Sequence, residues 1–577
     1  MDAHERNTMN TITMSMKPSD TVQIFLDSGE IIEGPRDASI EYFLKNSSLW
    51  SVADPIVGAI INDRLRELTY RIELEANVKP VHMSDSDGAL IYRRSLTFLM
   101  AAAFEALYPS DHLVIDHSVV SGGYYCRVQN REDISVEEVR LLEEKMWAYV
   151  EADMPFEKRQ VPLTEAIAHF ESRGQTEKVR LLNYRQKSHL ILYKLADHQD
   201  YHHGYMLPSS GYLKTFGLVK VRNGFILRYP RRSSPTSLQD MGTSLVLLGT
   251  FGQYRQWLSR LNIEDVGALN TAIVNKRVRE LVLVAEALHE QRIASIAQHI
   301  VGEKDEIDLV LIAGPSSSGK TTTSKRLTVQ MITQGLTPYT MELDNYFVDR
   351  ADTPKDENGE YDFESLYAVN IQRLNEDLKK LVRGEQVQLP KYNFLTGLSE
   401  DGEVVQLQRG QVIIMEGIHG LNPDLLPEFS VDKAFRIYVS CLTQLNLDRY
   451  NRISTTDTRL IRRIVRDARE RGYSATDTIR RWDLVRRGEK KHIFPYQDYA
   501  DEMLNSALVY ELSAVKNLAE PLLRQVSSKS VEYIEANRLL SMLEWFLPMD
   551  SDMIPDNSIL REFIGGSILH NFDPRNL

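Results

Sequence analysis

A glycine-rich loop near the middle of the chain carries the clearest chemical signal in the sequence. Residues 309–327 read LVLIAGPSSSGKTTTSKRL, and residues 314–321 fit the spacing G-x-x-x-x-G-K followed by Ser or Thr. Such a loop wraps backbone N–H groups around phosphate oxygens, while Lys320 reaches the β- and γ-phosphates and the Thr321 hydroxyl can ligate Mg²⁺. The residues expected to bind the nucleotide are Gly314, Ser316, Ser317, Ser318, Gly319, Lys320, Thr321 and Thr322.

Two carboxylates follow strand-like runs further along the chain. Asp344 ends the run in YTMELDNYF, and Glu416 ends the run in QVIIMEG. Either residue alone is more often a helix cap or a surface charge. Together with Thr321 they could converge on a nucleotide-bound Mg²⁺, and one acid could take a proton from an acceptor hydroxyl.

An arginine-rich stretch follows these carboxylates. Six arginines occur within thirteen residues: Arg459, Arg462, Arg463, Arg466, Arg469 and Arg471. The stretch could be a solvated basic helix face. Beside a phosphate-binding loop, we expect instead a lid that closes over the phosphates, because charge that develops on a transferred group needs fixed cations.

The elements that must position these groups follow an α/β pattern. Residues 309–313 are apolar, as in a strand buried on both faces of a parallel sheet, and the segment after the loop has helical spacing. From residue 307 onward, strands alternate with helices. The sequence therefore predicts a parallel sheet flanked by helices, with C-terminal helices, over residues 301–577.

The preceding half divides into smaller units. We expect a flexible leader over residues 1–18, a small β-rich domain with a hairpin over 19–82, an α+β domain over 83–235 and a helical connection over 236–300. Residues 265–300 carry long helical periodicity.

Composition excludes several classes of protein. The 577 residues carry a net charge of −13, which disfavours nucleic acid as a partner, although a local basic patch stays open. The two cysteines, Cys126 and Cys441, lie too far apart in the sequence to suggest a disulfide framework or a thiolate cluster. The absence of a long apolar run predicts a cytoplasmic protein without a membrane span. Self-association into a homo-oligomer stays open.

The second half resembles the uridine kinase and phosphoribulokinase branch of P-loop kinases. The matching motifs, in family order, are GPSSSGKT, ELDNYF, YDFESLYA, LPKYNFLTG, VIIMEGIHGLNP, DTRLIRRIVRDARERG and FPYQDYADEML. The resemblance implies ATP- and Mg²⁺-dependent phosphorylation of a nucleoside 5′-hydroxyl, with Asp344 as general base and Lys320 and Arg463 as further catalytic residues.

The same resemblance implies roles for other side chains. Asp344, Tyr346, Asp362, Tyr392, Phe394 and Arg459 would contact the nucleoside; Arg462, Arg463 and Arg466 would serve the ATP phosphates; Thr321 and Glu416 would hold Mg²⁺. Two positions depart from the uridine kinase pattern, since Gly397 replaces a base-reading His and Arg481 replaces a Gln. We therefore expect a broader or shifted base preference.

The first half resembles threonyl-tRNA synthetase. Residues from TVQIFLDSGEIIEGP resemble its β-grasp TGS domain, and LIYRRSLTFLMAAAFEALYP with HHGYMLPSSGYLKTFGLVKV resembles its second additional, or editing, domain. The four positions of the family's metal or hydrolytic pocket here hold Arg94, Phe98, His202 and Met206. Since a guanidinium and a phenyl ring cannot ligate zinc, we expect no bound zinc and no deacylation of mischarged tRNA.

Two alternatives to a nucleoside kinase stay open. The chain could phosphorylate another small hydroxyl compound, because related kinases share the branch. It could also be a nucleotide-gated RNA-binding or regulatory protein, in which case its N-terminal half alone should bind tRNA in a salt-sensitive way.

Overall fold

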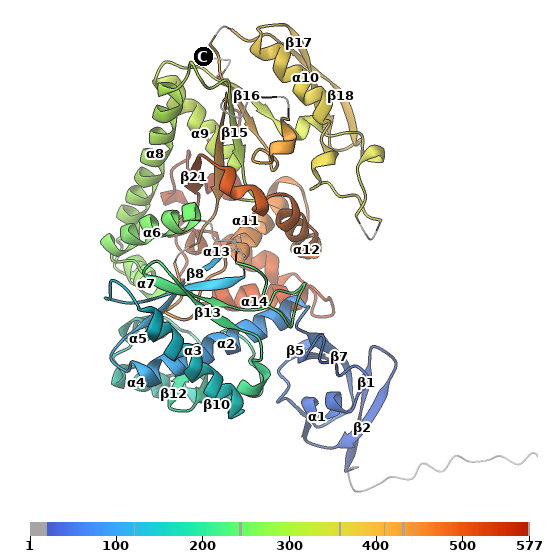
Figure 1. Ribbon diagram of the computed structural model, residues 1–577, viewed down its shortest axis with the longest axis vertical. Helices are drawn as coiled ribbons and strands as arrows, with labels where there is room; N and C mark the ends of the chain where they lie inside the picture. Colours follow the sequence, from blue (N-terminus) through green and yellow to red (C-terminus); the bar gives the residue numbers. More distant parts are fainter. Residues whose placement is uncertain are drawn as a thin grey trace, which may run out of the picture.

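A computed structural model describes residues 20–119, 122–241, 245–356, 359–408, 410–427, 429, 433–443 and 445–574. The leader expected over residues 1–18 lies outside these ranges. In Figure 1 the regions that precede residue 240 occupy the lower half of the molecule, and the parallel sheet lies above them.

The first region is a small mixed sheet with one short helix. Its strands have the order β2-β1-β7-β4-β5, with β1 and β7 parallel, and a short β3-β6 pair lies beside them. The expected hairpin is confirmed, because β1 pairs antiparallel with β2. The elements are β1 (Thr21–Leu26), β2 (Ile31–Pro35), β3 (Ala38–Ser39), α1 (Ile40–Lys45), β4 (Ile56–Ile61), β5 (Arg64–Arg66), β6 (Arg71–Ile72) and β7 (Ala76–His82).

The second region is the expected α+β unit. A four-stranded sheet, β13-β14-β9-β8, and a three-stranded sheet, β10-β11-β12, are accompanied by four helices. The elements are α2 (Ser86–Leu107), β8 (Leu113–Val119), β9 (Gly123–Val128), α3 (Val136–Glu151), β10 (Glu157–Pro162), α4 (Leu163–Ser172), α5 (Thr176–Leu182), β11 (His189–Leu195), β12 (His198–Asp200), β13 (Gly217–Val221) and β14 (Gly224–Arg228).

The connection consists of α6 (Leu245–Arg260), α7 (Val266–Val274) and α8 (Val278–Gly302). The periodicity over 265–300 thus spans two helices, because Lys276 adopts a left-handed conformation, φ 59°, and ends the first one. The second half of α8 is not a free linker. Its Ile293, Ile296 and Ile300 pack in one cluster with Val310 and Ile312 of the central strand.

The C-terminal region is the predicted parallel sheet. Its strands have the order β16-β19-β15-β20-β21, and every neighbouring pair is parallel. Its elements are β15 (Leu309–Ala313), α9 (Lys320–Thr333), β16 (Tyr339–Glu342), α10 (Ile371–Val382), β17 (Val387–Asn393), β18 (Leu398–Val405), β19 (Ile413–Glu416), β20 (Ala434–Ser440), α11 (Thr455–Glu470), α12 (Ala475–His492), β21 (Glu502–Asn505), α13 (Glu511–Arg524), α14 (Tyr533–Leu543) and α15 (Arg561–Ile564).

The sheet buries both faces, as its apolar strands predict. Alternate residues of β15 point to opposite sides: Leu309 and Leu311 join a cluster with α10 and the β17-β18 hairpin, while Val310 and Ile312 join the cluster with α8 and α9. The elements that hold the phosphate-binding loop are therefore fixed from both sides.

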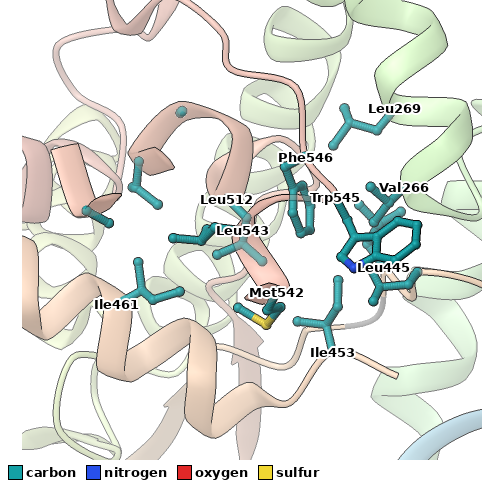
Figure 2. Packing of buried hydrophobic residues seen from close by; sticks show 14 of the residues in the cluster. Val266, Leu269, Leu445, Ile453, Ile461, Leu512, Met542, Leu543, Trp545 and Phe546 are labelled. Atoms are coloured by element: carbon teal, nitrogen blue, oxygen red, sulfur yellow. The ribbon is translucent and has the colours of Figure 1, made fainter. Parts of the chain in front are cut away.

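A third core joins the two halves of the chain. It contains side chains from α4, α5, α7, α11, α13 and α14. Figure 2 shows Val266 and Leu269 of α7 beside Trp545 and Phe546, which directly follow α14. Among the described residues, no helix combines the length and the apolar character that a membrane crossing requires.

Candidate functional site

The phosphate-binding loop lies at the carboxyl end of β15, between Ala313 and the start of α9 at Lys320. From β15 the chain continues to β16 on one side of the sheet and later to β20 on the other. This is the point at which an open parallel sheet forms its binding crevice.

The conformation of the loop fits phosphate binding. Gly319 has φ 90°, in the left-handed region that favours glycine, and it precedes the first turn of α9. The hydroxyls of Ser317 and Ser318 are buried and have no hydrogen-bond partner among the described residues. Buried, unpaired hydroxyls beside a helix N-terminus can donate to the oxygens of a bound phosphate.

Thr321 and Glu416 offer oxygens for Mg²⁺. The Thr321 hydroxyl donates to Glu416 Oε1 at 2.7 Å, and Glu416 Oε2 is buried with no hydrogen-bond partner in the described part of the chain. Burial raises the pKa of Glu416 to about 7, although the Lys320 charge and the Thr321 hydrogen bond oppose this shift. A hydroxyl and an unpaired carboxylate oxygen fit the hard, oxygen-seeking cation.

Asp344 lies in a 3₁₀ turn, Leu343–Tyr346, directly after β16. Burial raises its pKa, and the positive charges of Lys320 and Arg471 act in the opposite direction. Asp344 and Glu416 also interact electrostatically with each other and with Lys320. The structure therefore brings the three predicted groups from three segments to one site.

Sequence reasoning missed one carboxyl group at this site. Burial, followed by repulsion from Glu489, raises the pKa of Glu364 to about 7, and Glu364 also interacts with Arg463, Lys320 and Asp344. Glu364 could have been found from the sequence, because it lies in the motif YDFESLYA, two residues after Asp362.

The arginines of α11 divide into two groups. Arg463 Nη1 donates to Ser316 Oγ at 2.7 Å, and Arg463 and Arg466 both pair with Asp467 at 3.2 Å. Arg463 therefore lies at the edge of the phosphate-binding loop, and Arg466 follows it by three residues on the same helix. Contact with ATP phosphates is compatible with this position and stays a prediction.

The other two predicted arginines are buried. Arg459 forms an ion pair with Glu489 and donates to the Ser316 carbonyl at 2.8 Å. Arg462 forms an ion pair with Glu511 and donates to the Ser506 carbonyl at 2.9 Å. Since both guanidinium groups are held by a buried carboxylate and a backbone carbonyl, this arrangement favours a structural role that supports the loop. Their contacts with nucleoside and ATP stay predictions.

The aromatic residues predicted to bind the nucleoside lie in two places, a partly exposed cluster and the protein interior. The rings of Tyr392 and Phe394 lie 5.1 Å apart, with Phe394 60% exposed, and Phe347 packs against both. Tyr346 is buried instead, and its hydroxyl donates to Asp377 at 3.2 Å. This favours a core role for Tyr346.

The other predicted acceptor ligand, Asp362, lies 3.7 Å from His492 Nε2. The Asp362 carboxylate and the exposed ring of Phe394 are thus the acidic and the aromatic group with which a substrate could interact.

The two departures from the uridine kinase pattern have structural consequences. Gly397 has φ 76° in the turn of the β17-β18 hairpin, and a Cβ there would lie 2.8 Å from the guanidinium of Arg350. Arg350 also donates to the Phe394 carbonyl at 2.8 Å, so a cationic side chain fills the space next to the aromatic cluster. Arg481 is exposed and stacks on Tyr473, with 4.5 Å from the guanidinium carbon to the ring centroid.

The four positions that by resemblance correspond to the synthetase pocket are packed against protein groups. Arg94 donates to the Tyr205 carbonyl at 2.5 Å, the Phe98 ring packs 5.5 Å from that of His202, and Met206 is buried. The described residues contain no group of three or more His, Cys, Asp or Glu that could hold a metal ion.

Residues 309–512 match the sequence model of the Phosphoribulokinase / Uridine kinase family, so this C-terminal part of the chain is a P-loop domain of that family. Among solved structures, the chain is similar to a possible uridine kinase from Bacillus stearothermophilus, with 28% identity and a TM-score of 0.22 over 26% of this chain and 79% of that one. It is also similar to D-glycerate 3-kinase from Cryptococcus neoformans, with 17% identity and a TM-score of 0.20 over 46% and 89%.

The N-terminal third is similar to threonine–tRNA ligases. The enzyme from Methylococcus capsulatus is 32% identical over 175 residues, which are 30% of this chain and 27% of the ligase. The enzyme from Legionella pneumophila is 27% identical over 198 residues, 33% and 31% of the two chains. The chain thus spans less than a third of the length of these curated relatives.

Proposed function

We propose that this chain is a kinase that uses ATP and Mg²⁺ to phosphorylate the 5′-hydroxyl of a nucleoside. The observation that supports this most is the convergence of Lys320, Asp344 and the Thr321–Glu416 pair at the carboxyl ends of neighbouring parallel strands. Each group has the chemistry that phosphoryl transfer needs: a cation for the phosphates, a base and oxygen ligands.

In this proposal the protein positions groups and manages charge. Lys320 and Arg463 neutralise the phosphate oxygens, and Asp344 accepts the proton of the attacking hydroxyl. As the new oxygen–phosphorus bond forms, the bond between the γ-phosphorus and the β–γ bridging oxygen breaks, and ADP leaves with that oxygen. Bound Mg²⁺, held by Thr321 and Glu416, would add positive charge to the same oxygens. The raised pKa of Asp344 suits a group that must bind a proton during the reaction.

The aromatic cluster and Asp362 support a ribonucleoside as acceptor. Phe394 offers a flat, exposed ring to a base, and the Asp362 carboxylate can accept hydrogen bonds from ribose hydroxyls. Arg350, next to Gly397, replaces a neutral reader of one pyrimidine edge by a cationic donor. We expect uridine not to be the exclusive substrate.

A panel assay tests the proposal. ATP consumption is measured with uridine, cytidine, adenosine, guanosine and inosine, and kcat/KM is compared between the native chain and Arg350→Ala. Activity on at least one nucleoside, with base preference altered by Arg350→Ala, is the expected result. Strong exclusive preference for uridine contradicts the role given to Gly397 and Arg350. Activity on none of the five supports another hydroxyl acceptor or a regulatory role.

A further inference from the structure

The end of the chain crosses the start of the P-loop helix. We call residues 555–570 the C-terminal strap; it contains α15 (Arg561–Ile564). One oxygen of the Glu562 carboxylate accepts both the backbone N–H of Thr322, at 3.1 Å, and the Thr322 hydroxyl, at 2.8 Å. Further along α9, Lys325 donates to the carbonyls of Leu569 and His570, at 2.8 and 2.9 Å.

The donors that Glu562 occupies are ones that a phosphate would use. Thr322 lies in the first turn of α9, where backbone N–H groups have no acceptor within the helix and attract anions. A carboxylate and a phosphate oxygen therefore compete for the same N–H and hydroxyl. In this structure the Glu562 carboxylate oxygen accepts the hydrogen bonds that one phosphate oxygen would otherwise accept.

The strap also covers the loop sterically. A Cβ at Gly319 would lie 2.6 Å from the side chain of Ile559, which places this strap residue directly against the last glycine of the loop. Arg469, near the end of the arginine helix α11, donates to the backbone carbonyls of Phe563 and Glu562, at 3.0 and 3.1 Å. The strap is thus tied to the loop, to α9 and to α11 at once.

A second carboxylate holds the other end of the loop in a different way. Glu489 accepts the backbone N–H of Ser316 at 3.1 Å, and it is fixed by an ion pair with Arg459 and a hydrogen bond from Arg486 at 3.1 Å. Two guanidinium groups keep Glu489 in the interior. Glu562 accepts its side-chain hydrogen bonds, among the described residues, from Thr322.

We propose that the C-terminal strap is autoinhibitory: Glu562 occupies the Thr322 donors in the resting protein and leaves them when a nucleotide phosphate binds. The inference rests on the proposed nucleotide site. Because only the fraction of molecules with a displaced strap can bind, the apparent affinity for ATP is lowered by that fraction. Displacement of the strap then breaks the hydrogen bonds that Arg469 of α11 donates to Phe563 and Glu562.

ATP affinity measured by calorimetry tests the strap. Glu562→Gln keeps the size of the side chain but removes its charge, and a charge-assisted hydrogen bond is about twice as strong as a neutral one. We expect the variant to bind ATP roughly 5- to 10-fold more tightly than the native chain. Lys325→Met, which loosens the strap at its other contact, should shift the Kd in the same direction. Glu544→Gln, which breaks a surface pair with Lys187, is the matched control and should leave the Kd unchanged.

Hydrogen exchange supplies a readout that does not depend on turnover. Amides of residues 555–570 should exchange faster when ATP is added to the native chain, and faster in Glu562→Gln without ATP. Unchanged or weaker ATP binding by both variants, with native-like melting, overturns the strap proposal and leaves the proposed function standing. If the native chain and both variants all fail to bind ATP, the proposed function fails and the strap proposal falls with it.

Discussion

At the scale of single residues, the side chain proposed to bind the phosphates and the one proposed to act as the base come from different segments of the chain. Lys320 begins the helix that follows the loop, whereas Asp344 follows a different strand, β16. Thr321 and Glu416 touch although 95 positions separate them in the chain. Each side chain can therefore be changed with a separate expected effect.

We expect Lys320→Ala to weaken ATP binding and turnover together, because it removes the cation on the phosphates. Asp344→Asn should keep ATP binding and lower phosphoryl transfer by roughly 10²-fold or more, the scale of a positioned general base. Isothermal titration and steady-state kinetics with the best acceptor measure the two effects. The exposed Asp401→Asn is the control, and near-normal turnover by Asp344→Asn would exclude Asp344 as the base.

Glu364 makes stability depend on pH. Its folded-state pKa, about 7, lies above the ordinary 4.5. The folded protein therefore holds this proton more tightly than the unfolded chain does. That contribution to stability is complete below pH 4.5 and is lost as the pH rises through 7.

We expect Glu364→Gln to be more stable than the native chain at pH 8 and similar at pH 4.5. The difference of free energies of unfolding is at most about 3 kcal/mol, because neighbouring cations relieve part of the cost. Thermal melting across this pH range, without nucleotide, measures it. Glu360→Gln, at an exposed carboxyl group, should follow the native curve, and a parallel curve for Glu364→Gln would contradict the assignment.

At the scale of elements, α11 presents arginines for two purposes. Arg462 and Glu511 form a buried pair, each side chain at most 5% exposed, whereas Arg463 reaches the hydroxyl of Ser316 on the loop. Adjacent positions of a helix point in directions about 100° apart, so Arg462 and Arg463 reach different surroundings. The helix is thus both part of the core and a wall of the site.

We expect Arg462→Met to lower the free energy of unfolding by about 3–5 kcal/mol, because it leaves the buried Glu511 charge unpaired. Arg463→Met should leave melting nearly unchanged and lower kcat by roughly 10²-fold. Chemical denaturation and kinetics on both variants test this. The double variant Arg462→Met/Glu511→Gln should regain part of the stability. If Arg462→Met is as stable as the native chain but cannot bind ATP, Arg462 contacts the ATP phosphates and the structural role is wrong.

At the scale of the whole molecule, the synthetase-like region braces the loop that precedes α11. The Tyr201 hydroxyl donates to Asp448 at 2.6 Å, and Asn446 donates to the Ile115 carbonyl at 2.9 Å. Trp545, in the turn that follows α14, donates to His203 Nδ1 at 3.2 Å. Together with the shared core of Figure 2, these contacts couple the two halves.

We expect Asp448→Asn to lower the free energy of unfolding by about 1–3 kcal/mol, because the buried carboxylate accepts several hydrogen bonds. Calorimetry should show the native chain melting in one transition and the variant in two, as the halves lose their coupling. Asp197→Asn, at an exposed carboxylate between β11 and β12, controls for the loss of charge. Two transitions already present in the native chain would argue against a brace.

The sequence by itself determined the parallel sheet, the phosphate-binding loop and the position of Asp344 and Glu416 at strand ends. These follow from local rules: apolar runs bury strands, the spacing of the glycines defines the loop, and parallel strands align their carboxyl ends. The residue types at positions 94 and 98 also come from the sequence alone, and the absence of bound zinc that they imply stays a prediction, since an arginine and a phenylalanine cannot ligate zinc.

Only the tertiary structure decided how deep each side chain lies and what it contacts. Arg462 and Arg463 are adjacent in the sequence, yet one is neutralised by Glu511 in the core and the other reaches Ser316 on the loop. Glu562 lies 240 positions from Thr322, and their contact depends on the path of the last helices across the loop. Burial and long-range pairing arise from the packing of distant segments, which no local pattern encodes.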